Sequence, residues 1–310
     1  MRSTKLGVVA MAMLAAGTAC GAEPASSASR AASTSSASAR PADPQRALRE
    51  LEAAHHDHIG AFALDTGTGR TVGYRMNERF PELSTWKAME TAEVLDRARR
   101  SDPGLLDRMV HWTASQEVTG SPLTAGHGRA TGMTVSQLIG AAMSVSDNTA
   151  ANLVLDQIGG DPTSLTRYYR SIHDPISRLD HNETALNDWR PGELHDTTTP
   201  ASIGRDLNRV TLGDALTAPD RTRLIGWLRG CLTGGERIRA GLPKNWTVGD
   251  KTGTNSAFGA ANDIAIAWPP SHAPLIITVY TYGKPGSAVD NKAIAAAAAL
   301  LVRSLVPASA

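Results

Sequence analysis

The chain has 310 residues, of which 41% are hydrophobic and 20% are charged. This composition excludes a disordered protein and a multi-pass membrane protein, because both have far more biased compositions. The 31 Lys and Arg residues against 30 Asp and Glu residues give a net charge of +1, so nothing in the charge balance points to nucleic acid as a partner. Two cysteines, Cys20 and Cys231, are too few for a disulfide framework or a four-cysteine zinc site.

Residues 1–19 have the pattern of a secretory signal peptide. Arg2 and Lys5 precede an apolar run that is too short to span a bilayer as a helix. The small residues before Cys20 resemble the lipobox of bacterial lipoproteins, in which that cysteine becomes the acylated first residue. Ordinary cleavage nearby with free secretion is the alternative. Both predict export, either to the cell membrane through a lipidated Cys20 or into the medium.

A flexible tether is expected over residues 20–43, which are rich in Ala and Ser and offer almost no large apolar side chain to bury. The folded part is predicted to begin with a helix, because Asp43 and Pro44 make a plausible N-cap and first helical residue. The apolar spacing carries this helix to about His58.

Strand and helix patterns then follow one another along the chain. Two β-prone runs at residues 59–65 and 71–77 are separated by hairpin chemistry, and residues 84–232 are helical in pattern without a competing strand signal. Later strands are expected at residues 246–251, 263–268 and 275–282, and a terminal helix at residues 292–306.

This order predicts an α+β fold. A five-stranded antiparallel sheet flanked by the terminal helices is expected from residues 44–79 and 233–310, with an all-helical domain of residues 80–232 inserted into it. Clefts between such domains commonly hold active sites. Neither a repeat nor a Gly-rich phosphate motif is evident, which argues against solenoid, Rossmann and P-loop folds.

Ser84 and Lys87 form an S-x-x-K motif. If Ser84 opens a helix, the two side chains lie one turn apart on one face, which places an amine beside a hydroxyl. Serine is a weak nucleophile unless a neighbour takes its proton, and lysine can do so only where burial or nearby positive charge lowers its pKa. Alone, the spacing is more typical of an ordinary capped helix.

Two further motifs give the first one a chemical context. S-D-N occupies residues 146–148, expected in a loop between helices, and K-T-G occupies residues 251–253, expected at the end of a strand. In this order the three motifs are the signature of class A β-lactamases and penicillin-binding proteins. The Ser146 hydroxyl can relay a proton to a leaving nitrogen, and Asn148 can bind a substrate amide and Lys87.

The K-T-G strand is expected to bind the rest of the substrate. Lys251 supplies a cation for a substrate carboxylate, with Thr252 beside it. Gly253 lets the strand edge pass close to the ligand, so the backbone N–H groups of Ser84 and Thr254 could form an oxyanion hole. Such a site would form an acyl-enzyme.

Over about residues 51–302 the sequence resembles the class A serine β-lactamases. Glu183, Leu186 and Asn187 fit the family's E-x-x-L-N element on an Ω-loop, here about residues 178–196. The resemblance implies that Glu183 and Asn187 hold the water that hydrolyses the acyl-enzyme, an arrangement that penicillin-binding proteins lack. It also implies that Arg237 assists in binding the substrate carboxylate.

The resemblance therefore implies hydrolysis of the β-lactam ring of penicillins or cephalosporins, and hence resistance to them. Ser84 would be the nucleophile and Glu183 the base of deacylation, while Lys87 and Glu183 both remain candidates for the base of acylation. No metal and no cofactor is expected, and a monomer is expected. Two residues depart from the family pattern. His181 replaces an arginine that pairs with Asp196, which suggests a pH-sensitive Ω-loop, and Gly120 replaces an aromatic side chain.

Three alternatives stay open from the sequence. The group His55, His56, Asp57 and His58 superficially resembles a zinc hydrolase element, but its spacing does not fit and a polar end of the first helix is the better account. A D,D-peptidase would share acylation by Ser84 and lack rapid deacylation. A non-catalytic exported binding lipoprotein would keep the motifs without turnover.

Overall fold

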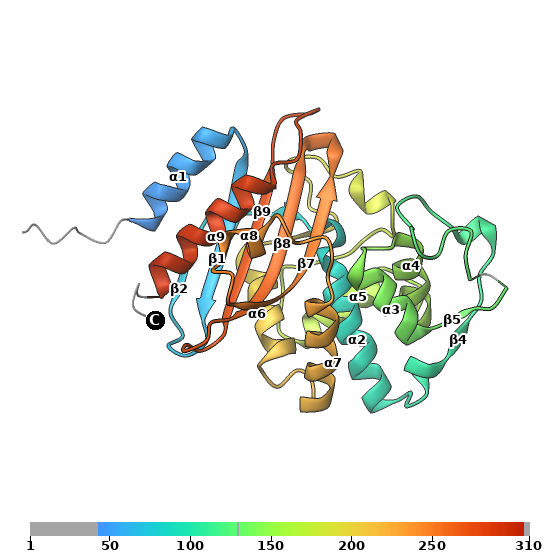
Figure 1. The fold of residues 1–310 in the computed structure, drawn as a ribbon. Coiled ribbons are helices and arrows are strands. Elements are labelled where there is room, and N and C mark those ends of the chain that lie inside the picture. The colour runs from blue at the N-terminus through green and yellow to red at the C-terminus, as the bar shows by residue number, and fades with distance from the viewer. Residues whose placement is uncertain (1–42, 129, 307–310) are drawn as a thin grey trace, which may run out of the picture. The chain divides into compact units, whose positions relative to one another are not determined.

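The computed structural model describes residues 43–128 and 130–306 (Figure 1). The predicted signal peptide, Cys20 and the predicted tether up to residue 42 lie outside these residues. Five antiparallel strands form the main sheet, as predicted, and their spatial order is β2-β1-β9-β8-β7. Their bounds are β1 (His58–Asp65), β2 (Thr71–Tyr74), β7 (Thr247–Asn255), β8 (Ala260–Trp268) and β9 (Leu275–Tyr282). The early hairpin joins the late strands because β1 pairs with β9 along its whole length.

The sheet separates two hydrophobic clusters, because successive side chains of a strand point to opposite faces. On β8, Ile264 and Ile266 join one cluster, and Ala265 and Ala267 join the other. The alanine side packs against the Ala-rich helix α9, so small residues on both elements allow close approach. Helices α1 (Pro44–His55), α8 (Ile238–Gly241) and α9 (Asn291–Leu305) lie on this side, and α6 (Pro200–Thr211) packs on the other (Figure 1).

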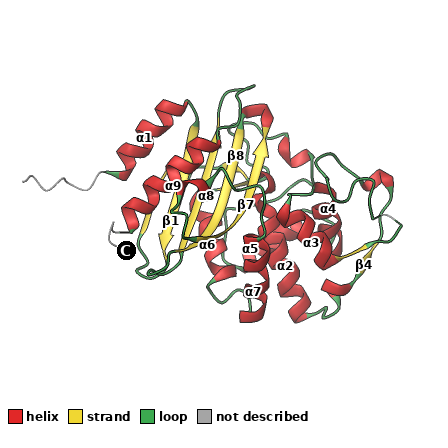
Figure 2. Cartoon of the chain, viewed as in Figure 1, coloured by secondary structure: helices red, strands yellow, loops and turns green. Residues whose placement is uncertain are grey.

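The remaining helices gather beside the β7 edge (Figure 2). They are α2 (Trp86–Arg100), α3 (Val135–Ser144), α4 (Asn148–Gln157), α5 (Thr163–Ser171) and α7 (Ala218–Arg229). Helix α2 is their centre, and Trp86, Met89 and Leu95 on it are almost fully buried. The division into a sheet domain and a helical domain at residues 79/80 and 232/233 stays a prediction. Within the described residues no helix is both long and apolar enough to cross a membrane.

Short elements inside the helical region correct the expectation that it lacks strands. Strand β3 (Phe80–Pro81) pairs with β6 (Thr197–Thr198), and β4 (Met109–Val110) pairs with β5 (Met133–Thr134). Two-residue strands are too short to show a period in sequence. The part of the chain that the structure describes also contains five 3-10 turns: η1 (Leu83–Thr85), η2 (Leu105–Asp107), η3 (Ala114–Gln116), η4 (Ala185–Asn187) and η5 (Ser256–Phe258).

Several element ends also differ from the predictions. Helix α1 stops at His55, not His58, because His56 adopts a left-handed conformation with φ of 59°. Strand β2 ends at Tyr74 because Arg75 also has a positive φ, of 45°. Strand β7 continues past Lys251 to Asn255, since its pairing with β8 carries on to the end of both strands. A Thr-Gly-Thr-Asn segment has little strand character alone, and the neighbouring strand decides its conformation.

Candidate active site

Ser84 lies in turn η1, directly before helix α2. It therefore precedes the helix instead of opening it. One turn along, Nζ of Lys87 donates a hydrogen bond of 3.1 Å to Oγ of Ser84, so the amine and the hydroxyl are in contact, as the S-x-x-K spacing predicts. The residue before Ser84, Leu83, has φ of 48°, which is strained for a residue with a side chain and marks a locally constrained turn.

The buried amine of Lys87 contacts two other segments of the chain, the S-D-N motif and the segment that carries Glu183. It donates to the backbone oxygen of Ser146 at 2.9 Å and to Oδ1 of Asn148 at 2.7 Å. It also lies 3.0 Å from Oε1 of Glu183. Ser146 lies between α3 and α4 with φ of 62°, and Asn148 is the first residue of α4. The Lys87 ammonium group thus connects the S-x-x-K motif to the S-D-N motif by hydrogen bonds.

Asp147, the middle residue of S-D-N, holds the loop in place. Its carboxylate caps α4 by accepting from the backbone N–H of Ala150 at 2.9 Å. The same carboxylate accepts from the backbone N–H of Leu123 and from Oγ1 of Thr124, at 2.9 and 2.6 Å. Asp147 therefore ties residues 123–124 to the start of α4, and this buried network keeps Ser146 and Asn148 beside Lys87.

Lys251 of the K-T-G motif is fully buried on β7. Its Nζ donates to Oγ of Ser146 at 2.9 Å and to the backbone oxygen of Thr252 at 2.8 Å. Burial, followed by the positive charge of Lys87, lowers the pKa of Lys251 to about 7. The second lysine of the site therefore changes charge close to neutral pH.

Gly253 allows β7 to approach the serine turn. A Cβ atom at this position would lie 2.8 Å from Cβ of Leu83 and 3.0 Å from the backbone nitrogen of Ser84. The first contact is shorter than those that real Cβ atoms make, and the second, to backbone, is tighter than most of them. The glycine is therefore required for the close packing of the strand edge on η1.

Arg237 is 5% exposed and lies behind the K-T-G strand. Its guanidinium donates to the backbone oxygens of Gly253 and Asn262, at 2.7 and 2.8 Å, and to Oγ1 of Thr254 at 2.6 Å. These bonds fix the end of the strand and orient the Thr254 hydroxyl. On the motif itself, Oγ1 of Thr252 lies 2.5 Å from Oγ1 of Thr233.

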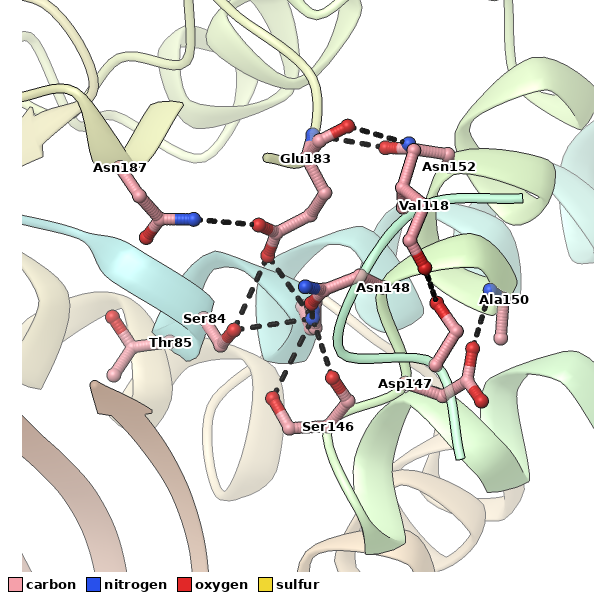
Figure 3. A network of polar contacts seen from close by, with 12 residues as sticks. Ser84, Thr85, Val118, Ser146, Asp147, Asn148, Ala150, Asn152, Glu183 and Asn187 are labelled. Atoms are coloured by element: carbon pink, nitrogen blue, oxygen red, sulfur yellow. Dashed lines mark hydrogen bonds and ion pairs between the residues drawn. The ribbon is translucent and has the colours of Figure 1, made fainter. Parts of the chain in front are cut away.

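Glu183 and Asn187, the ends of the E-x-x-L-N element, contact each other (Figure 3). The Nδ2 group of Asn187 donates to Oε2 of Glu183 at 2.9 Å, and Oγ of Ser84 donates to Oε1 at 3.2 Å. Sequence analysis missed Asn152, whose side chain forms two hydrogen bonds with the backbone of Glu183, at 2.8 and 3.0 Å. Its position one turn after Asn148, on the same face of α4, was the available signal.

The two departures from the family pattern are visible in the geometry. Nδ1 of His181 lies 2.7 Å from Oδ2 of Asp196, so the pair at the neck of the Ω-loop forms with histidine. The hydrogen bond to Asp196 raises the pKa of His181. Gly120 has φ of 78°, and a Cβ atom there would lie 2.7 Å from Nδ2 of Asn148. At position 120 the chain therefore presents no side chain beside Asn148.

The histidine group at the end of α1 has other partners. Nδ1 of His55 lies 2.7 Å from Oδ2 of Asp290, and Nε2 of His58 lies 2.9 Å from Oε2 of Glu78. In the described part of the chain, no three His, Cys, Asp or Glu side chains are grouped so that they could hold a metal ion. Only His55 of the group belongs to the helix, in contrast to the prediction.

Comparison with known proteins identifies the family. Residues 43–305 match the model of the β-lactamase enzyme family. The chain is 46% identical to β-lactamase AST-1 of Nocardia asteroides, over 85% of this chain and 84% of that protein. An ancestral class A β-lactamase has a TM-score of 0.81 and 44% identity, covering 85% of this chain and 100% of that one. The chain belongs to the class A β-lactamases.

The prediction of a class A β-lactamase with its α+β fold is thereby confirmed, and the enzyme hydrolyses the β-lactam ring. A β-lactamase structure from Streptosporangium roseum has a TM-score of 0.82 and 56% identity, over 84% of this chain and 98% of that one. The carbapenem-hydrolysing β-lactamase KPC of Klebsiella oxytoca is 44% identical over 81% of this chain and 85% of that protein. Matches of this extent include both the sheet and the helices around the site.

Proposed function

We propose that this β-lactamase acts through an acyl-enzyme, with Ser84 as nucleophile and Glu183 as the base that activates the deacylating water. One observation carries the proposal. The carboxylate of Glu183 accepts a hydrogen bond from Ser84 with one oxygen and from Asn187 with the other. A single base therefore reaches both the nucleophile and the place where a water molecule would have to be held.

In acylation, Oγ of Ser84 attacks the lactam carbonyl carbon while its proton passes to a base, and the ring C–N bond breaks. The contact of 3.2 Å between Ser84 and Glu183 supports Glu183 as acceptor, and the contact with Lys87 leaves a route through the lysine. The leaving nitrogen needs a proton in turn. The Ser146 hydroxyl, which contacts Lys251 at 2.9 Å, is the proposed donor.

Substrate is held by groups along β7. We propose that the ammonium of Lys251 and the hydroxyls of Thr252 and Thr254 bind the substrate carboxylate, with Arg237 fixing Thr254 from behind. The backbone N–H groups of Ser84 and Thr254 are the proposed oxyanion hole, supported by the close approach of β7 to η1 at Gly253. Asn148 is the proposed partner for a substrate amide.

In deacylation, a water molecule held by Glu183 and Asn187 attacks the ester carbonyl. Its proton passes to Glu183, the C–O bond to Ser84 breaks, and the serine oxygen recovers a proton. Because Glu183 is buried and also held through its backbone by Asn152, it is pre-oriented for this step. A site without this carboxylate would retain the acyl group.

The test combines turnover of a chromogenic cephalosporin with intact-protein mass spectrometry. We expect multiple turnovers from the natural enzyme, neither turnover nor adduct from Ser84→Ala, and a persistent adduct from Glu183→Gln. The exposed acid Glu78, changed to Gln, serves as control and should leave turnover intact. Hydrolysis by Ser84→Ala, or rapid release from Glu183→Gln, would contradict the proposal. A persistent adduct on the natural enzyme would instead match a D,D-peptidase, and no reaction a binding lipoprotein.

We further propose export of a monomer, with residues 1–19 as signal peptide and residues 20–43 as tether. The pattern around Cys20 supports lipidation, and ordinary secretion is the alternative. Mass spectrometry of the protein from cell membranes and from medium distinguishes them, because a lipidated mature chain begins with acylated Cys20. Light scattering tests the monomer, and separate expression of residues 80–232 tests the proposed helical domain.

A further inference from the structure

Trp189 lies on the Ω-loop two residues after Asn187, and the mechanism proposed above gives it no role. Its side chain is almost fully buried. The indole packs against two rings from the sheet side of the molecule. Its centroid is 5.3 Å from that of Tyr282 and 6.2 Å from that of Phe258, with interplanar angles of 68° and 71°. Both are edge-to-face contacts, the arrangement that aromatic pairs favour.

The two partner rings come from different parts of the sheet. Tyr282 is the last residue of β9, and Phe258 is the last residue of η5, the turn that joins β7 to β8. The two partners are tied to each other, because the backbone N–H of Gly283 donates to the backbone oxygen of Phe258 at 2.7 Å. Trp189 therefore contacts a fixed corner of the sheet, formed by the end of β9 and the turn after β7.

A hydrogen bond beside the rings joins the same two segments. Nδ2 of Asn255, at the end of β7, donates to the backbone oxygen of Asn187 at 2.5 Å. Residues 172–196, which include the Ω-loop, contain only one regular element, the 3-10 turn η4, which ends at Asn187. With so little regular backbone structure, the position of this segment depends on its side-chain contacts. Trp189 provides the large buried ring next to η4.

We propose that Trp189 is a positioning residue for deacylation: its packing on Tyr282 and Phe258 holds η4 so that Asn187 and Glu183 stay aligned on the acyl-enzyme. The inference rests on the proposed role of Glu183. We call the contacts of Trp189 with Tyr282 and Phe258 the clamp. Deacylation should depend on the clamp more than acylation does, because water must be held by Glu183 and Asn187 together. In acylation, the direct contacts of Glu183 with Lys87 and Ser84 keep the carboxylate in place.

The experiment separates the two steps in Trp189→Leu and Trp189→Phe by rapid-quench mass spectrometry of the acyl-enzyme. We expect Trp189→Leu to slow deacylation by about 10- to 100-fold, as small misalignments of a catalytic group do, and to accumulate acyl-enzyme in the steady state. Its acylation rate should change by less than about threefold. Trp189→Phe, which keeps an aromatic ring, should restore most of the deacylation rate. Trp246→Leu is the control and should leave the ratio of the two rates unchanged, because the half-buried Trp246 directly precedes β7 and packs on the other face of the sheet.

Phe258→Leu removes one of the two ring contacts of Trp189 without changing Trp189 itself. It should also slow deacylation selectively, and it replaces Trp189→Leu if that variant does not fold. Unchanged deacylation in either folded variant, or an equal loss in both steps, would overturn the inference. Glu183→Gln measured alongside keeps two failures apart. If Glu183→Gln accumulates adduct and Trp189→Leu does not, only the clamp is wrong, whereas an absence of adduct in Glu183→Gln contradicts the proposed function itself.

Discussion

Nζ of Lys87 lies 3.0 Å from Oε1 of Glu183, and neither side chain is exposed to solvent. Removing one member of a buried ion pair leaves the other charge without compensation, which typically costs about 3–5 kcal/mol. We therefore expect Lys87→Met to lower the free energy of unfolding by about 3 kcal/mol, measured by urea denaturation at pH 7. The double variant Lys87→Met/Glu183→Gln should recover most of this loss. Additive losses in the double variant would show that the two groups are not coupled.

Lys251 should make substrate capture pH-dependent. Its pKa of about 7 means that the ammonium proposed to bind the substrate carboxylate loses its charge as pH rises through neutrality. We expect kcat/KM, which reports the free enzyme, to fall above pH 7 by up to about tenfold per pH unit. Lys251→Arg keeps its charge and should flatten this limb of the profile. The same alkaline fall in Lys251→Arg would assign the titration to another group.

His181 should make the Ω-loop more stable in mild acid. The hydrogen bond to Asp196 raises the pKa of His181, so its contribution to folding is full below the ordinary value of about 6.5. It is lost as pH rises through the raised pKa. We expect greater protection of the loop amides from hydrogen exchange at pH 5.5 than at pH 8, after correction for intrinsic rates. His181→Arg should remove the difference, and equal protection in the natural enzyme would refute the hypothesis.

Glu90 should reduce stability at alkaline pH. This carboxyl is buried on α2, one turn after Lys87, and its Oε1 has no hydrogen-bond partner among the described residues. Burial raises the pKa of Glu90 well above its ordinary value. The folded state keeps a proton that the unfolded chain releases above about pH 4.3, so stability falls as pH rises from there towards the raised pKa.

We therefore expect the stability of Glu90→Gln relative to the natural enzyme to increase between pH 4.5 and pH 8, by about 1–3 kcal/mol. Urea denaturation across this range measures the change. Glu50→Gln, which alters an exposed acid of α1, is the control and should show a constant difference. A constant difference for Glu90→Gln as well would mean that its carboxyl ionises in the folded protein as it does in the unfolded chain.

Gly253→Ala should damage catalysis through the backbone of the nucleophile. The added methyl group would press on Leu83 and on the backbone nitrogen of Ser84, which moves the serine turn or the strand edge. A misplacement of about 1 Å at a catalytic group costs about 100-fold in rate. We therefore expect kcat/KM of Gly253→Ala to fall by up to about 100-fold. Gly140→Ala, in helix α3 with open space around its Cβ, is the matched control and should keep full activity. Similar activity in both variants would contradict the assigned close approach.

Local sequence patterns were sufficient for much of this protein. β-prone runs, the hairpin residues between the first two of them, and the Ala-rich terminal run predicted the five strands and α9. The motifs at Ser84, at residues 146–148 and at residues 251–253 identified the chemistry, since each needs specific residue types at short spacing. The end of β7 was missed because the pairing with β8, and not local propensity, determines it.

The sequence alone therefore determined the family, and it indicated the residues that we propose carry its chemistry. Only the tertiary structure decided how residues far apart in the chain act on one another. The contact of Glu183 with Ser84, its backbone bonds to Asn152, the lowered pKa of Lys251 and the packing of Trp189 all arise between separate elements. Distances, burial and neighbouring charge set these properties, and all three exist only once the sheet and helices have packed together.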